Sequence, residues 1–96
     1  MKLIEEKNRI AGFNENNGMV AEITWQEKDN VLWVNHTFTD PSLRGQGIAA
    51  QLVDAAVEKA TRDQQLIMPV CPYVVSKFDK EPDKYQHIDA RHSNKD

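Results

Sequence analysis

Three segments between residues 9 and 39 have the pattern of β-strands, and one of them alternates apolar and polar residues with a period of two. Residues 9–14 are typical of a short strand, and residues 16–18 (Asn-Asn-Gly) supply a hairpin turn. Apolar residues at every second position predict another strand over 19–26. Residues 31–39 are rich in β-branched and aromatic side chains on both faces, which predicts a central third strand. We therefore expect an antiparallel meander.

Uninterrupted alternation in the third strand would place Leu32, Val34, His36 and Phe38 on one face. The period changes to 3.6 after residue 47, which predicts a helix from Ile48 to about residue 63. Its apolar stripe consists of Ile48, Ala49, Leu52, Val53, Ala56, Val57 and Ala60.

A short apolar strand is expected over residues 65–70, and Pro69 favours an edge or irregular position for it. Strand, helix and strand in this order predict a parallel crossover. Pro72 stands at the first position of an expected short helix over 72–78. Residues 77–96 carry few apolar side chains, so we expect a short helical segment and a frayed tail from about residue 86.

The predicted fold is therefore a mixed α/β (α+β) arrangement: an antiparallel meander, a strand-helix-strand crossover and a short C-terminal helix. A chain of 96 residues with 40% hydrophobic and 28% charged residues is expected to form one domain over residues 1–96. A net charge of −3 argues against a nucleic-acid partner. No apolar stretch has the length of a membrane span or the pattern of a signal peptide. Because the one cysteine, Cys71, cannot form an internal disulfide, we expect a cytoplasmic protein, most simply a monomer.

Two glycines stand where the third strand gives way to the helix, in the segment LRGQGIA (residues 43–49). Glycines let main-chain N–H groups approach an anion closely, and a helix N-terminus favours negative charge. The segment lacks the lysine of a P-loop and the third glycine of a dinucleotide fingerprint. The alternative is that the glycines only permit a tight turn. The candidate phosphate-binding residues are Arg44, Gly45, Gln46, Gly47, Ile48 and Ala49.

Arg44, Gly47 and Ala49 match the pattern Arg/Gln-x-x-Gly-x-Gly/Ala of the GNAT superfamily of N-acetyltransferases, which this chain resembles. The flanking segments VNHTFTDPSLRGQGIAAQLVDAAVEKA and LIMPVCPYVVSKF also resemble the family, so the likeness covers roughly residues 9–78. The resemblance is to a short subgroup without the N-terminal helices that usually cover the acceptor site.

This resemblance implies that acetyl-coenzyme A is the cosubstrate and an unidentified amine is the acceptor. It implies that the loop binds the pyrophosphate, and that the pantetheine arm pairs with main-chain groups at Phe38 and Thr39. Tyr73 is assigned to the cofactor contacts as well.

Cys71 and His36 are the candidate catalytic residues. Cys71 ends a strand and stands at the N-cap of the next helix, where a thiolate is favoured. It is a candidate nucleophile or acetyl carrier, and the alternative is a small buried hydrophobic residue. His36 can accept a proton near neutral pH, so it can deprotonate an amine or activate Cys71; the alternative is a histidine held by hydrogen bonds.

The chain departs from the family pattern where many members carry Asn-x-x-Ala-x-x-x-Tyr. The corresponding residues here are Cys71, Val74 and Phe78, and phenylalanine cannot protonate a departing thiolate. Tyr73 or Tyr85 can replace that acid. The departure leaves open a second function, a module that binds or senses acetyl-coenzyme A without catalysis, and a third, a structural or partner-binding domain. With no second cysteine and no HxxxH pair, no metal site is expected.

Overall fold

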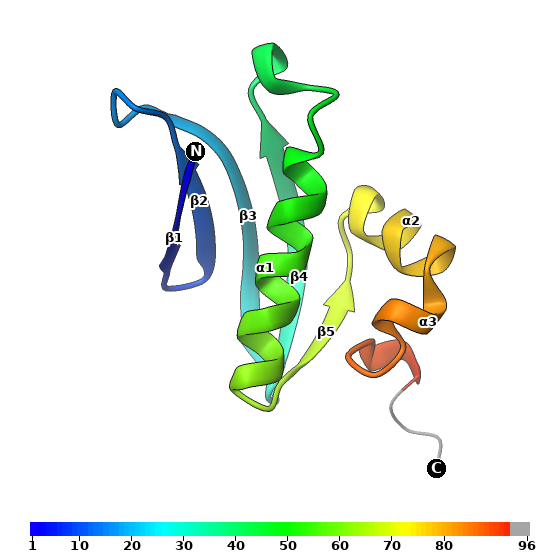
Figure 1. Cartoon of the computed structure of the whole chain (residues 1–96). Coiled ribbons are helices and arrows are strands. Elements are labelled where there is room, and N and C mark those ends of the chain that lie inside the picture. Colours follow the sequence, from blue (N-terminus) through cyan, green and yellow to red (C-terminus); the bar gives the residue numbers. More distant parts are fainter. Residues whose placement is uncertain (93–96) are drawn as a thin grey trace.

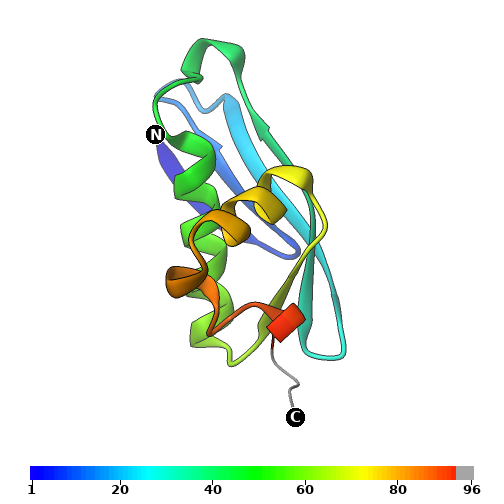
Figure 2. The same cartoon turned by 90° about the vertical axis from the view of Figure 1, so that its right-hand side faces the viewer.

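The computed structural model describes residues 1–92, and these form a five-stranded sheet with helices on one face (Figures 1 and 2). The strands follow one another in chain order across the sheet; the first four pair antiparallel and the fifth runs parallel to the fourth. The predicted meander, parallel crossover and edge position of the last strand are confirmed. The strands are β1 (Lys2–Glu6), β2 (Arg9–Phe13), β3 (Met19–Lys28), β4 (Val31–Thr39) and β5 (Leu66–Pro69).

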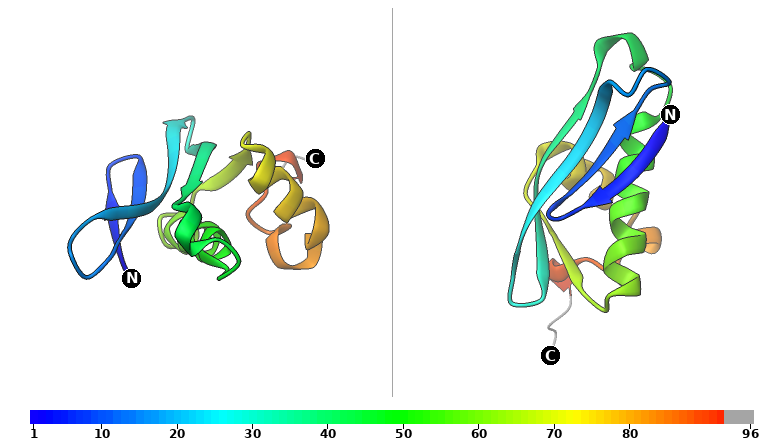
Figure 3. Two further views of the ribbon diagram at one scale, coloured as in Figure 1. Left: turned by 90° about the horizontal axis from the view of Figure 1, so that it is seen from above. Right: turned by 90° about the vertical axis from the view of Figure 1, so that its left-hand side faces the viewer.

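The helices follow the fourth strand and lie on the same side of the sheet, as the view from above shows (Figure 3). No helix within residues 1–92 is long and apolar enough to cross a membrane. Within that same range, no helix lies on the opposite face, which we call the outer face. The helices are α1 (Ile48–Arg62), α2 (Pro72–Lys80) and α3 (Pro82–Tyr85), with 3-10 turns at Pro41–Leu43 and Ala90–His92.

Local turn chemistry fixes the meander. Asp29 and Asn30 both have positive φ (56° and 65°), as a two-residue type I′ hairpin between β3 and β4 requires. In the turn between β2 and β3, the Asn14 Oδ1 atom accepts hydrogen bonds from the N–H groups of Asn16 and Gly18, each at 2.9 Å. The turn at residues 16–18 is confirmed, and the turn at Asp29 and Asn30 lies between the strands predicted over 19–26 and 31–39.

The amphipathic stripe of α1 supplies the centre of the core. Its side chains at Leu52, Val53, Ala56 and Ala60 are at most 1% exposed and belong to one cluster with the inward side chains of the sheet. Burial of a leucine or valine side chain contributes roughly 1.5–3 kcal/mol to the free energy of unfolding. This packing holds α1 against the sheet and places its N-terminus beside the end of β4.

An extra residue in β4 reverses the faces of that strand. Thr24 pairs with His36 and Trp25 pairs with Val34, so Asn35 is a β-bulge. Leu32 and Val34 face the helices before the bulge, and alternation resumed after it puts Thr37 on that face. The prediction that His36 and Phe38 share a face with Leu32 and Val34 is therefore wrong: both lie on the outer face. A single unpaired residue shifts the period of two by one position.

The pairing of β4 with β5 ends halfway along β4. The register runs from Val31–Leu66 to Val34–Pro69, whereas β3 stays paired with β4 as far as Thr39. At the point of separation, the Val34 carbonyl accepts hydrogen bonds from the N–H groups of Val70 and Cys71 at 2.9 and 3.0 Å. The second half of β4 therefore has no strand on its β5 side.

β1 was not predicted, because its sequence has only two adjacent apolar residues, Leu3 and Ile4. It forms because β2 offers an unpaired edge, and because Asn8 adopts positive φ (64°) in the connecting turn. An ion pair between Glu6 and Arg9 spans that turn.

The frayed tail expected from about residue 86 is wrong for residues 86–92. Ile88 and Asp89 are each 3% exposed, and the Ile67 N–H donates to the Ile88 carbonyl at 2.8 Å. Burial alone would raise the pKa of Asp89, but hydrogen bonds and the positive charge of Arg91 outweigh it and hold the pKa below its ordinary value. No periodic apolar pattern signals this ordering, because Ile88 is a single buried apolar side chain in a polar segment. The remainder of the expected tail, residues 93–96, lies outside the described residues.

We expect Ile88→Ala to lower the free energy of unfolding by about 2–5 kcal/mol, because it removes buried side-chain volume from the core. The milder Ile88→Val should cost about 0.5–1.5 kcal/mol. Urea denaturation measures both, with the exposed neighbour His87→Ala as a matched control. Equal midpoints for all three variants would contradict the packing of this segment.

Candidate functional site

The loop between β4 and α1 begins with a capped 3-10 turn. Asp40 accepts hydrogen bonds at Oδ1 from the Ser42 N–H (2.9 Å) and the Ser42 hydroxyl (2.7 Å), which lower the pKa of Asp40. The Leu43 N–H donates to the Asp40 carbonyl, and the Arg44 N–H donates to the Pro41 carbonyl. The chain thus leaves the strand in a defined direction before the glycines.

Gly45 and Gly47 both adopt left-handed conformations, with φ of +86° and +75°. An ideal Cβ placed on either residue would meet no atom within 4 Å. The glycines are therefore required by the backbone conformation and not by crowding, and the space beside them is open. This observation agrees with both sequence interpretations, the tight turn and the anion site.

The N-terminus of α1 leaves main-chain donors without acceptors. The first helical hydrogen bond runs from the Gln51 N–H to the Gly47 carbonyl (3.1 Å), so the N–H groups of Ile48, Ala49 and Ala50 precede it. The N-cap residue Gly47 has no side chain to accept from them, and the first turn holds no acidic residue. Within residues 1–92 these three N–H groups have no hydrogen-bond acceptor, and a helix N-terminus in this state favours an anion.

A cavity of about 440 Å³ opens beside this helix terminus. Among its lining residues, Thr39, Arg44, Gly45, Gly47, Ile48, Ala49 and Tyr73 are predicted cofactor contacts, and Thr37, Leu43 and Ala50 are additional. Thr37 was missed because only the bulge turns it inward. Leu43 and Ala50 flank the predicted loop directly, so a wider window around the motif would have included them.

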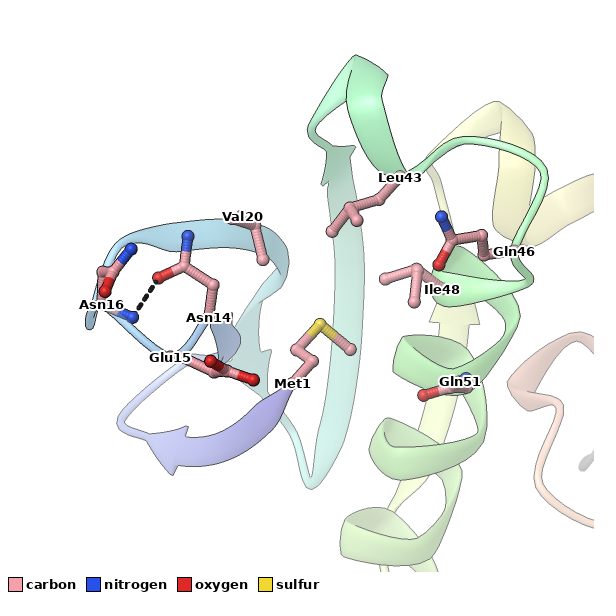
Figure 4. Close-up of a pocket in the computed structure, with 9 residues that line it drawn as sticks. All are labelled: Met1, Asn14, Glu15, Asn16, Val20, Leu43, Gln46, Ile48 and Gln51. Carbon is pink, nitrogen blue, oxygen red and sulfur yellow. Dashed lines mark hydrogen bonds between the residues drawn. The ribbon is translucent and has the colours of Figure 1, made fainter.

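Two of the predicted cofactor contacts do not line this cavity. Gln46 lies in the loop, but its side chain borders a second cavity on the other side of α1 (Figure 4). Phe38 is 36% exposed on the outer face because of the bulge at Asn35. Its side chain is therefore directed away from the cavity that Thr37 and Thr39 line.

Cys71 is 7% exposed and forms the N-cap of α2. Its Sγ atom lies 3.6 Å from the Thr37 hydroxyl, close enough for a weak hydrogen bond. Thr37 and Tyr73 line the cavity, so the thiol is adjacent to it behind Thr37 and is also part of the core cluster. Both interpretations of this residue, as a nucleophile and as a buried hydrophobic residue, remain compatible with its position.

His36 lies on the opposite face of β4, where its side chain is 52% exposed. Its Nε2 atom is 3.2 Å from the Glu22 Oε2 atom, and the other Glu22 oxygen accepts from Arg9 at 3.2 Å. The structure does not bring His36 and Cys71 together, because adjacent residues His36 and Thr37 point to opposite faces. Activation of the thiol by this histidine is therefore not supported.

The two candidates for a replacement acid lie in different environments. Tyr73 is 37% exposed and lines the cavity. Tyr85 is 1% exposed, stacks on Phe78 at 4.6 Å and donates to Asp54 at 2.9 Å. Burial, together with the hydrogen bond to Asp54, raises the pKa of Tyr85. Tyr85 is therefore a core residue, and only Tyr73 stays available near the cavity. Over residues 1–92, no group of three or more His, Cys, Asp or Glu side chains is arranged to hold a metal ion.

Comparison with known proteins agrees with this geometry. Residues 10–88 match the family described as GCN5-related N-acetyl-transferase. The chain belongs to this family. The solution structure of a GCN5-like, proposed N-acetyltransferase from Staphylococcus aureus is 31% identical, with a TM-score of 0.72 over 91% of this chain and 85% of that one. Members of the GCN5-related family generally use acetyl-CoA.

A second similar structure supports the fold alone. The crystal structure of a proposed acetyltransferase from Agrobacterium tumefaciens is 22% identical, with a TM-score of 0.61 over 82% of this chain. The match spans 57% of that longer chain. No curated protein sequence matches this one significantly. In the present GCN5-related chain, all three motif residues, Arg44, Gly47 and Ala49, line the 440 Å³ cavity.

We expect Gly47→Ala to lower the free energy of unfolding by about 1–2 kcal/mol, because alanine is strained at a left-handed φ even where space is open. Gly18→Ala is the matched control, since its φ is not in that region, and it should change stability by less than about 0.5 kcal/mol. Thermal or urea unfolding of both variants checks the difference. A Gly47→Ala variant as stable as Gly18→Ala would contradict the conformation of the loop.

Proposed function

We propose that the protein is an N-acetyltransferase that binds acetyl-CoA in the 440 Å³ cavity and acetylates an amine. The observation that carries the proposal is the set of unpaired N–H groups of Ile48, Ala49 and Ala50 at the cavity wall, with Arg44 beside them. These donors suit the pyrophosphate of the cosubstrate. Acetyl-CoA, when bound, supplies an acetyl group activated as a thioester.

The exposed edge of β4 supports the position of the pantetheine arm. The Asp40 N–H donates to the Val20 carbonyl on the β3 side, so alternation turns the main-chain groups of Thr39 and Thr37 toward the β5 side. No strand pairs with that edge beyond Val34. The amides of an extended arm can add there as a strand would. Thr37 takes the place that the sequence assigns to Phe38, because the main-chain groups of Phe38 point toward β3.

Two routes of acetyl transfer are considered. One uses His36 on the outer face of β4, and the other uses Cys71 beside the cavity. In the direct route, the amine nitrogen bonds to the acetyl carbon as the bond to the CoA sulfur breaks. His36, oriented by Glu22, takes the proton from an amine that approaches the unpaired edge of β4 from the outer face. CoA leaves as a thiolate, which Tyr73 can protonate.

In the covalent route, the Cys71 thiol gives its proton to solvent, and its sulfur bonds to the acetyl carbon as the bond to the CoA sulfur breaks and CoA leaves as a thiolate. The amine nitrogen then bonds to the same carbon and releases Cys71 as a thiolate, and the amine proton passes to solvent. This route needs the thiol to reach the cavity, which Cys71 itself does not line but which is lined by Thr37, whose hydroxyl is 3.6 Å from the Cys71 Sγ atom.

A binding or sensing module without catalysis is the second candidate. It is favoured by the small number of candidate acids at the cavity. Phe78 stands where many family members carry a tyrosine, and the hydroxyl of the buried Tyr85 donates to Asp54. Among residues 1–92, Tyr73 is the one tyrosine that lines the cavity. This candidate shares the cofactor site with the first, so only product formation separates them.

We expect acetyl-CoA to bind saturably and Arg44→Ala to weaken binding about ten-fold, through loss of a charge-assisted contact to the phosphates. Isothermal titration calorimetry measures both affinities. Lys28→Ala is the control, because Lys28 is an exposed cation at the β3–β4 turn, at the other end of β4 from the loop. Equal affinities for wild type and Arg44→Ala, or no binding at all, would reject the site.

We expect His36→Gln to lower the rate of acetyl transfer to an amine about a hundred-fold or more, without changing acetyl-CoA affinity, if the direct route operates.

Under the covalent route, Cys71→Ala abolishes turnover instead, and the mass of the intact wild-type protein rises by one acetyl group after incubation with acetyl-CoA. Product formation with a panel of amines, measured beside the mass of the protein, decides between them. Saturable binding with no acetylated amine and no adduct would favour the binding module.

A further inference from the structure

An uncovered apolar surface lies on the outer face of β4 and β5. The register pairs Val31 with Leu66 and Trp33 with Met68, whereas Ile67, between the two β5 residues, is buried in the core. Because successive side chains of a strand alternate, both pairs point to the outer face, which no helix covers in the described part of the chain (Figure 3). None of the four side chains is buried, and Trp33 is 37% exposed. A contiguous group of exposed apolar side chains indicates a binding surface.

The bulge in β4 places His36 on the same surface. Regular alternation would put Trp33 and His36 on opposite faces, because an odd number of positions separates them. With Asn35 unpaired, both lie on the outer face, opposite β3 residues that are two positions apart, which is about 7 Å along the strand. Phe38 stands opposite a β3 residue two positions further on. Trp33, His36 and Phe38, here called the aromatic row, therefore place a histidine between two exposed rings.

The polar side chains beside the aromatic row are largely paired with one another. Glu22 contacts His36 Nε2 with one oxygen and Arg9 with the other, each at 3.2 Å. Arg9 also forms an ion pair with Glu6, so two carboxylates on this face share one guanidinium. The Thr24 hydroxyl donates to the side-chain oxygen of the bulge residue at 2.7 Å. The net charge beside His36 is that of a single carboxylate, which suits a ligand with one ammonium group.

Lys28 and Gln26 continue the outer face of β3 beside Val31 and Trp33. The Lys28 ammonium repels a second positive charge on a ligand that covers the apolar pairs. Gln26 is one carboxamide beside four apolar side chains, so a polyhydroxylated ligand would lose more hydrogen bonds to water than it gained there. Apolar area is the main contribution that this surface makes to binding.

We infer that this surface binds a primary amine attached through a short alkyl chain to an aromatic body. The ring lies on Trp33 and Met68, and the amine lies beside His36, at the distance that the aromatic row sets. Under the proposed function, on which this step rests, such an amine is the acetyl acceptor. Its nitrogen then reaches the unpaired edge of β4 from the outer face, where the direct route needs it.

The first experiment measures binding in the absence of acetyl-CoA. The ¹⁵N-labelled protein is titrated with phenethylamine, ethylamine, spermidine and glucosamine and followed by two-dimensional NMR. The chain has two tryptophans, so the indole N–H of Trp33 reports on the surface while that of Trp25, 2% exposed, serves as an internal reference. We expect saturable shifts at the Trp33 indole and at His36, with phenethylamine bound about ten-fold more tightly than the other amines because its ring is buried.

Variants of Trp33 test which part of the ligand the indole holds. Trp33→Ala should weaken phenethylamine about five- to ten-fold and leave ethylamine unchanged, because only the ring contacts the indole. Trp33→Phe keeps an aromatic ring and should stay within about two-fold of wild type. The control is Leu3→Ala, which removes an apolar side chain of similar exposure (36%) on the edge strand β1 and should change neither affinity.

The second experiment offers the same amines as acceptors together with acetyl-CoA. We expect the highest kcat/KM for phenethylamine. Trp33→Ala should raise the KM for phenethylamine with little change in kcat, since the indole holds the aromatic body and not the reacting atoms.

The two experiments separate failure of the inference from failure of the proposed function. The inference would be overturned by the absence of a saturable Trp33 shift with phenethylamine or by equal binding of all the amines. Preferential binding or acetylation of spermidine or glucosamine would also overturn it. Phenethylamine binding at Trp33 without acetylation of any amine would support the surface and reject the acetyl transfer.

Discussion

One extra residue in β4, Asn35, controls how the rest of the molecule presents its chemistry. Before this bulge, Leu32 and Val34 pack into the core, and after it Thr37 and Thr39 take the inward face. The separation of β5 from β4 begins at the same level, where the Val34 carbonyl accepts from two consecutive N–H groups of the chain leaving β5. Together they create a polar, unpaired strand edge next to a helix terminus, whereas the opposite edge of β4 stays paired with β3 as far as Thr39.

The N-terminus of α1 keeps main-chain donors free at some cost in stability. A serine, threonine, aspartate or asparagine at the N-cap of α1 would stabilise the helix by about 1 kcal/mol, by accepting from its free N–H groups. Gly47 leaves those groups without acceptors and adopts a left-handed φ of +75°. The helix is instead held by its buried stripe, and the donors stay available for an anion. Because this packing fixes α1, the helix remains stable although the N–H groups of its first turn have no hydrogen-bond acceptors.

The loop from Arg44 to Gly47 divides two chemically different cavities. Main-chain donors and a guanidinium border one, and carboxamides with a single carboxylate border the other. The outer face of the sheet adds a third environment, where Glu22 holds His36 close to an otherwise uncovered surface. These environments lie within a few residues of one another in sequence, because a tight strand-loop-helix connection sends alternate side chains in opposite directions.

The sequence alone determined the elements whose signals are local: the hairpin turns, α1 and its stripe, the edge strand with Pro69, and the GNAT-like motif at Arg44, Gly47 and Ala49. It could not determine the faces of β4, since a bulge is defined by pairing with another strand and cannot be located from the residues of β4 alone. For the same reason, Thr37 was missed, Phe38 was assigned to the cofactor contacts, and His36 was placed with Cys71. Gln46 was assigned to those contacts because it stands within the motif, whereas its side chain borders the second cavity. The ordering of Ile88 and Asp89 was also decided by tertiary contacts, because a short polar segment becomes structured only where the core offers it a partner.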